Sequence, residues 1–120
     1  MTTETTAQAH LLGLFPPGSS VDPDGELVVG GCRLADLAAA WGTPLYLVEE
    51  EAVRAHVRRY RRALGAEWPN SRMVFASKAF PCTAMYRLMA AEGIGVDVAG
   101  VSDALTAKHS RSCALRHSGR

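Results

Sequence analysis

The sequence predicts an α/β protein in which a parallel sheet is covered by helices. Short apolar segments, expected to be strands, alternate with segments of helical periodicity between residues 45 and 99. Strands that are apolar at nearly every position are typical of parallel sheets buried on both faces. Parallel neighbours also require a long crossover, which a helix supplies and which is almost always right-handed. A chain of 120 residues is long enough for one modest core of this kind.

Composition and charge exclude several classes of protein. The chain is 48% hydrophobic and 21% charged, as globular proteins are, and its net charge of +1 argues against a dedicated nucleic-acid binder. No apolar run approaches the roughly 20 residues that cross a bilayer, and residues 1–10 do not resemble a signal peptide. The chain has three cysteines, Cys32, Cys82 and Cys113, and their separation in the sequence does not match the spacing of metal ligands. We therefore expect a cytoplasmic protein with no metal, no nucleic acid and no membrane as partner.

Turn and stop signals predict a hairpin and a helix in the N-terminal part of the chain. Residues 22–25, Asp-Pro-Asp-Gly, are a turn signal, and a short strand is expected over residues 26–29. Apolar residues then recur at helical spacing over residues 34–41, and Gly42 directly after them provides a stop.

A buried strand and an amphipathic helix are expected next. Residues 45–48 are all apolar, and glutamates at 49–51 open a helix at the end where its dipole favours negative charge. The apolar stripe of this helix runs to Leu64, and four arginines lie mostly on the other side: Arg54, Arg58, Arg61 and Arg62. We interpret them as a solvated face balanced by the glutamates, rather than as a phosphate or nucleic-acid site.

Two further strands are expected on either side of a second helix. The first covers residues 73–77. The helix covers residues 83–92, with Thr83 as its N-cap and Gly93 closing it. Residues 94–99 then return to an extended, valine-rich pattern.

Lys78 follows the first of these strands, at the sheet edge where parallel α/β folds collect ligands and catalytic groups. It is one of only two lysines in a chain that otherwise uses arginine for positive charge. A lysine amine can condense with a carbonyl group, which arginine does not do. The alternative interpretation is a surface lysine at the end of a strand.

Asp97 interrupts the last predicted strand, between Val96 and Val98. A carboxylate in so apolar a setting needs a partner. Because neighbouring parallel strands end at the same edge, Lys78 and Asp97 are expected to approach each other. The alternative is a structural aspartate that pairs with a backbone amide or an arginine.

Three blocks of the sequence carry a resemblance to a known family. They are WGTPLYLVEE at residues 41–50, FASKAF at 75–80 and AEGIGVDV at 91–98. In this order they resemble the N-terminal part of diaminopimelate decarboxylases, which belong to the alanine-racemase-like, fold-type III group of pyridoxal-phosphate enzymes. The resemblance extends over about residues 25–107, and its most specific part is Ala-Ser-Lys-Ala-Phe.

The resemblance implies a partial (β/α)8 barrel of the TIM type. The chain would supply about the first three βα units, preceded by a short β-hairpin segment that in relatives joins a C-terminal β-domain. On this basis residues 1–35 contribute to the β-domain, residues 36–107 form a partial pyridoxal-phosphate-binding barrel, and residues 108–120 are a non-homologous basic tail. A complete barrel needs about 250 residues, so we expect this truncated chain to be inactive alone.

The resemblance also implies an activity and its site. Lys78 would be the catalytic lysine that holds pyridoxal 5'-phosphate, Ala76 would pack near the cofactor ring, and Asp97 would lie beside the cofactor. The implied reaction is the decarboxylation of meso-diaminopimelate to L-lysine, a step of lysine biosynthesis. The resemblance thus predicts a small amino-acid substrate and, for the full-length relative, a homodimer.

Two segments depart from the family pattern. Where the family usually shows Ser-Gly-Gly-Glu-Leu, this chain has Gly-Val-Ser-Asp-Ala at residues 100–104. Beyond Ala107 the likeness stops, and the tail carries four basic and no acidic residues. We expect this tail to lack regular structure and interpret it as the product of a shifted reading frame. A basic nucleic-acid arm is the alternative.

Other functions stay open at this point. An ornithine- or arginine-type decarboxylase, or an alanine racemase relative, would share the cofactor lysine, because the residues that read the substrate lie outside this chain. A non-catalytic pyridoxal-phosphate carrier is disfavoured by the hairpin before the barrel, since such proteins lack a β-domain. An interaction module would use the arginine-rich face of residues 54–62.

Overall fold

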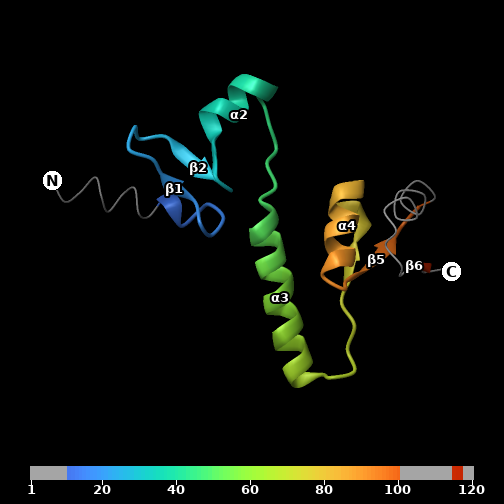
Figure 1. The fold of residues 1–120 in the computed structure, drawn as a ribbon. Helices are drawn as coiled ribbons and strands as arrows, with labels where there is room; N and C mark the ends of the chain where they lie inside the picture. Colours follow the sequence, from blue (N-terminus) through green and yellow to red (C-terminus); the bar gives the residue numbers. More distant parts are fainter. Residues whose placement is uncertain (1–10, 101–114, 118–120) are drawn as a thin grey trace. The chain divides into compact units, whose positions relative to one another are not determined.

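The computed structural model describes residues 11–100 and 115–117 of the chain. It divides into two units, Met1–Ala55 and His56–Arg120, and each is described by itself. Figure 1 gives the order of the helices and strands along the chain. No helix within the described residues combines the length and the apolar character that a membrane span requires.

An antiparallel sheet with the strand order β1-β2-β3 lies in the first unit. β1 (Ser20–Val21) pairs with β2 (Leu27–Val29), which confirms the predicted hairpin. In its turn, Asp22 Oδ1 accepts hydrogen bonds from the backbone N–H groups of Asp24 (3.0 Å) and Glu26 (2.9 Å). Aspartate is favoured in turns because its side chain can bind the backbone two or more residues later.

A further strand, β3 (Cys32–Arg33), is absent from the sequence prediction. It follows β2 through Gly30 and Gly31, whose φ angles are 57° and 79°. Two successive turn residues with positive φ form the tight loop that hairpin strands need, and glycine adopts this conformation without steric cost. An ion pair between Arg33 Nε and Asp22 Oδ2 (2.8 Å) then ties β3 to the first turn.

The predicted helix over residues 34–41 is confirmed as α2 (Leu34–Trp41). It ends at Gly42, whose φ is 81° and whose N–H donates to the carbonyl of Ala38 (2.8 Å). The glycine therefore stops the helix by adopting a backbone conformation that other residues rarely reach.

The buried strand predicted over residues 45–48 is wrong. These residues form an irregular segment, and all four side chains are exposed, with Tyr46 at 97%. An apolar run encodes a preference for burial, but a strand also needs a neighbouring backbone with free N–H and C=O groups. No described strand of the Met1–Ala55 unit pairs with this segment.

The long helix α3 (Glu50–Glu67) begins at the glutamates, as predicted. Glu49 lies just before it, and its carboxylate accepts hydrogen bonds from the backbone N–H groups of Glu51 (3.0 Å) and Ala52. These bonds satisfy donors of the first turn that have no partner inside the helix.

Two parallel strands and their connecting helix form the second unit. β4 (Val74–Ala76) pairs in parallel with β5 (Gly95–Val98), and Ala76 is the register partner of Asp97. The helix α4 (Thr83–Ala91) connects the two strands and packs against β5. The predicted order of strand, helix and parallel strand is thereby confirmed.

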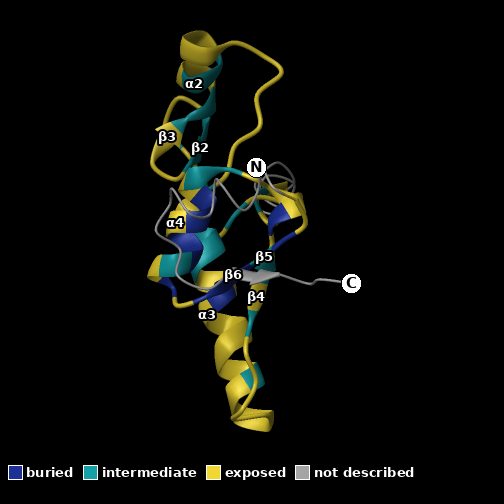
Figure 2. Ribbon diagram, turned by 90° about the vertical axis from the view of Figure 1, so that its right-hand side faces the viewer, coloured by how far each residue is buried: buried dark blue, intermediate teal, exposed yellow. Residues whose placement is uncertain are grey.

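The core of the second unit gathers on α4 and β5 (Figure 2). Buried apolar residues come mainly from one face of α4 and from β5 with the residue before it, and one comes from α3: Met85, Tyr86, Leu88, Met89, Ile94, Val96, Val98 and Val57. Gly93, with a φ of 71°, ends the helix as predicted and lets the chain turn into β5. The core therefore fixes the strand that carries Asp97.

The N-cap of α4 differs by one residue from the prediction. Cys82 occupies this position, and its Sγ accepts a hydrogen bond from the backbone N–H of Met85 (3.4 Å), whereas Thr83 is the first helical residue. Sulfur is a weak acceptor. The hydroxyl of Thr83 is therefore the stronger local signal, although the backbone geometry favours its neighbour.

The basic tail, expected to lack regular structure, contributes a strand. β6 (Leu115–His117) pairs in parallel with β5, with Leu115 as the register partner of Val96. The free edge of β5 binds through backbone N–H and C=O groups, so an extended segment of almost any sequence can pair with it. Residues 101–114 and 118–120, which make up the remainder of the C-terminal region, lie outside the described residues.

Tyr86 generates a first prediction, because it is 0% exposed and its hydroxyl has no hydrogen-bond partner in the described structure. An orphan buried hydroxyl costs about 1–3 kcal/mol. We expect Tyr86→Phe to raise the free energy of unfolding by about 1 kcal/mol in urea denaturation. Tyr86→Ala is the control that should lower it by about 3–5 kcal/mol. A clear loss of stability in Tyr86→Phe would mean that the hydroxyl is bonded in solution.

Candidate functional site

Lys78 lies in the turn that follows β4, at the carboxyl end of the parallel strands. This turn, η1 (Ser77–Ala79), is a single turn of 3-10 helix, and the backbone N–H of Phe80 closes it on the carbonyl of Ser77 (3.1 Å). Ser77 is 1% exposed, whereas Lys78 is exposed. A buried residue thus anchors the turn, and the turn presents the lysine at the sheet edge.

Asp97 lies on β5 beside the end of β4. It is half-buried between the buried residues Val96 and Val98. Its register partner Ala76 is the last residue of β4, two residues before Lys78. Register partners on neighbouring strands lie about 4.8 Å apart and on the same face of a sheet. The structure therefore brings Ala76 and Asp97 side by side and places Lys78 at the same edge.

Within residues 11–100, neither charged residue of this edge has a polar side-chain partner. Lys78 and Asp97 form no ion pair with each other, and within residues 11–100 neither side chain has a hydrogen-bond partner. The structural alternative for Asp97, pairing with a backbone amide or an arginine, finds no support within residues 11–100. It stays open on the other side of β5, where Arg116 of β6 is the register partner of Asp97. The edge therefore presents an exposed amine and a half-buried carboxylate.

Two residues that support the site are not identified by the sequence pattern. Ser77 anchors the turn beside Lys78, and Glu92 is a carboxylate only 7% exposed, directly after α4. The signal for Ser77 is a small polar residue that ends an apolar strand immediately before the lysine. Glu92 has no local signal, because its partner Arg58 lies 34 residues away in the sequence.

The arginines of α3 are divided between two kinds of partner. Arg54 Nε donates to Glu50 Oε1 (2.9 Å) on the same helix, which confirms the interpretation of a balanced solvated face at this position. Arg58 binds Glu92, with 2.7 Å between Nη2 and Oε1. These two guanidinium groups are therefore already occupied by carboxylates.

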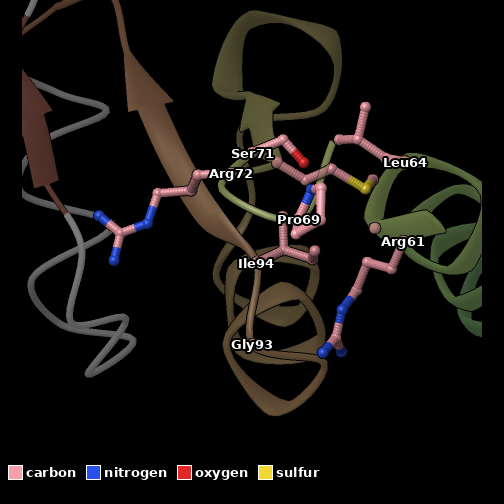
Figure 3. A pocket seen from close by; sticks show the side chains of 9 residues that line it. Arg61, Leu64, Pro69, Ser71, Arg72, Gly93 and Ile94 are labelled. Carbon is pink, nitrogen blue, oxygen red and sulfur yellow. The ribbon is translucent and has the colours of Figure 1, made fainter. Parts of the chain in front are cut away.

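A hollow lies at the amino ends of β4 and β5, the ends opposite to Lys78 (Figure 3 shows its lining). Its volume is about 240 Å³, and its lining includes Met73 and Ile94, which directly precede β4 and β5. The guanidinium group of Arg61 reaches toward Gly93, whereas that of Arg72 points away from the other lining residues (Figure 3). The two groups do not converge on one point, and this hollow contains none of the predicted site residues.

The fold and the position of the lysine together define a class. A parallel strand–helix–strand unit with its polar residues at the carboxyl end of the strands is the repeating element of a TIM-type barrel. Solved structures agree with this class. The diaminopimelate decarboxylase of M. jannaschii, in complex with L-lysine, matches with a TM-score of 0.68 and 30% identity, over 80% of this chain and 23% of that chain. These similarities confirm the partial-barrel fold.

Curated proteins that are similar in sequence belong to the same family, although no protein-family model matches the chain. The diaminopimelate decarboxylase of Actinosynnema pretiosum subsp. auranticum is 41% identical over 96 residues, which are 80% of this chain and 21% of that protein. That of Synechocystis sp. is 35% identical over 94 residues, 78% of this chain and 20% of that protein. The chain thus spans about a fifth of the length of these relatives. The resemblance to diaminopimelate decarboxylases predicted from the sequence is confirmed over that stretch.

The environment of Asp97 generates a second prediction. Because Asp97 has no hydrogen-bond or ion-pair partner within residues 11–100, Asp97→Asn should change the free energy of unfolding by less than about 0.5 kcal/mol. Val96→Asn is the matched control on the same strand, and burying its amide should cost about 3 kcal/mol. Urea denaturation measures both variants. If Asp97→Asn lost as much stability as the control, Asp97 would be a structural residue.

Proposed function

We propose that this chain carries the cofactor lysine of a pyridoxal-phosphate-dependent amino-acid decarboxylase. Lys78 is the catalytic lysine, and Ala76 and Asp97 are cofactor-binding residues. The observation that carries the proposal is the position of Lys78, in an anchored turn directly after β4 and beside the strand of Asp97. The similarity of this stretch to diaminopimelate decarboxylases supports it.

The residues at this edge fit the aldehyde and the aromatic ring of pyridoxal phosphate. The amine of Lys78 is exposed, and no carboxylate among the described residues neutralises it. Ala76 is exposed and has only a methyl group, so it leaves room for a ring beside the strand. Asp97 provides a negative charge one strand away, which can accept a hydrogen bond or balance a positive charge on the ring.

Each of these residues has a distinct part in the proposed mechanism. Pyridoxal phosphate, when bound, supplies an electron sink for the carbanion left by the departing carbon dioxide. Lys78 would hold the cofactor through its amine, and the same amine could hold a proton near the reacting carbon of the substrate. Asp97 orients the ring through its charge, and Ala76 does so because its small side chain leaves room for the ring. Orientation of this kind lowers the barrier by fixing the reacting geometry beforehand.

The substrate we propose is meso-diaminopimelate, and the products are L-lysine and carbon dioxide. The names of the relatives and the L-lysine bound in the M. jannaschii enzyme support this substrate class. For the assembled enzyme we propose a homodimer in the cytoplasm. A reducing compartment agrees with Cys32 and Cys82, which are both free thiols.

The alternative of an interaction module is less favoured by the side-chain contacts. Such a module would need the arginines of α3, but Arg54 and Arg58 are bound to Glu50 and Glu92. No observation favours an ornithine- or arginine-type decarboxylase, an alanine racemase relative or a non-catalytic carrier over the decarboxylase.

Reductive trapping tests the proposed role of Lys78. The 120-residue chain is incubated with limiting pyridoxal phosphate and reduced with borohydride, and the labelled peptide is identified by mass spectrometry. We expect the label on Lys78, and about tenfold less label in Lys78→Arg, because arginine does not condense with the aldehyde.

The second lysine of the chain provides the matched control for this experiment. Lys108→Arg removes the other lysine amine and should leave the labelling unchanged. Labelling that falls equally in the two variants, or that persists in Lys78→Arg, would overturn the proposed role.

The space beside Ala76 generates a further prediction. Ala76→Leu should lower the affinity of the chain for pyridoxal phosphate by about tenfold, because an added isobutyl group would fill the place of the ring. The affinity is measured by titrating the cofactor absorbance. Ala84→Leu is the control, because Ala84 is exposed on α4. An unchanged affinity in Ala76→Leu would place the ring elsewhere.

A further inference from the structure

Glu92 is a buried carboxylate at the junction between α4 and β5. It follows the last residue of the helix, and its backbone N–H still donates to the carbonyl of Leu88 (3.1 Å). The residue is 7% exposed. A charge removed from water to this extent requires close partners of opposite charge.

Two arginines of α3, one helical turn apart, hold residue 92 by its side chain and its backbone. Arg58 donates two hydrogen bonds to the carboxylate, from Nε to Oε2 at 3.0 Å and from Nη2 to Oε1 at 2.7 Å. Arg61 Nη1 donates to the backbone carbonyl of Glu92 at 2.6 Å. A forked contact of this kind fixes orientation as well as distance, and lysine cannot reproduce it.

The position of residue 92 determines where the next strand begins. Gly93 turns the chain with a φ of 71°, and the backbone N–H of Ile94 donates to the carbonyl of Met89 (2.8 Å). β5 then starts at Gly95 and reaches Asp97 after two more residues. Because successive side chains of a strand alternate between faces, a shift of one residue would move Asp97 to the other face of the sheet.

We propose that Arg58 and Glu92 are positioning residues for the cofactor site. By holding the α4–β5 junction against α3, they keep Asp97 in register with Ala76 and therefore at the same edge as Lys78. Neither residue touches the cofactor. This inference rests on the proposed function for its consequence in binding, but the register itself can be measured without any cofactor.

The register is tested first, on the 120-residue chain without cofactor. NMR contacts between the backbones of Ala76 and Asp97 are expected in the unmodified chain and in Arg54→Lys, because the Arg54 guanidinium pairs with Glu50 and Glu51 of its own helix. Arg58→Lys keeps the charge but loses the fork, and these contacts should weaken or disappear. Full retention of the contacts in Arg58→Lys would overturn the inference, whatever the outcome for cofactor binding.

Cofactor binding is tested second, in the same variants. Arg58→Lys should lower the affinity for pyridoxal phosphate by about tenfold, the order seen when a supporting partner is removed from a metal site, whereas Arg54→Lys should not change it. If the unmodified chain kept the register but did not bind pyridoxal phosphate, the proposed function would be rejected. The role of Arg58 and Glu92 in positioning β5 would not be affected by that result.

A double substitution separates positioning from stability. Glu92 is buried, whereas the side chain of Arg58 is 53% exposed. Replacing both residues by apolar side chains leaves no unpaired charge at the buried position, so most of the stability should be kept. Arg58→Met combined with Glu92→Leu should therefore fold even if Arg58→Lys does not, yet lose the contacts between Ala76 and Asp97. A double variant that keeps these contacts at full strength would show that the pair acts only on stability.

Discussion

The parallel pairing of β4 with β5 is the constraint on which the rest of the second unit depends. It brings Ala76 opposite Asp97 and, through the turn that follows, places Lys78 at the same edge. A parallel pair cannot be closed by a tight turn, so this arrangement also requires α4 as a crossover. The apolar face of that helix packs against β5 and provides half of the buried apolar residues described in the unit.

The local elements that could be predicted from the sequence are those encoded by short-range chemistry. Periodic apolar residues and the glycines at 42 and 93 determine where α2 and α4 end, and the Asp-Pro-Asp-Gly sequence determines the first turn. The carboxyl edge of the sheet could also be located, because a lysine after one apolar strand and an aspartate inside the next are both visible in the sequence. The resemblance to a family added the chemistry that those residues would serve.

The remaining features depend on partners that are distant in the sequence. Residues 45–48 have the composition of a buried strand, yet a strand also needs a neighbouring backbone to pair with. The local sequence does not show whether such a neighbour is present. The strand β6 is likewise formed by backbone pairing rather than by side-chain pattern. Glu92 looks like an ordinary surface residue at a helix end until Arg58, from the preceding helix, is placed against it. In each case the structure depends on a contact with a distant residue, which the local sequence preferences do not show.

The outer edge of β4 has a consequence for the behaviour of the chain in solution. In the order β4-β5-β6, β4 is terminal, so within the described sheet one side of its backbone has no neighbouring strand. Such an edge can recruit an extended segment of another molecule. With three residues in β4, only a few backbone bonds can form, so self-association through this edge would be weak, reversible and steeply dependent on concentration.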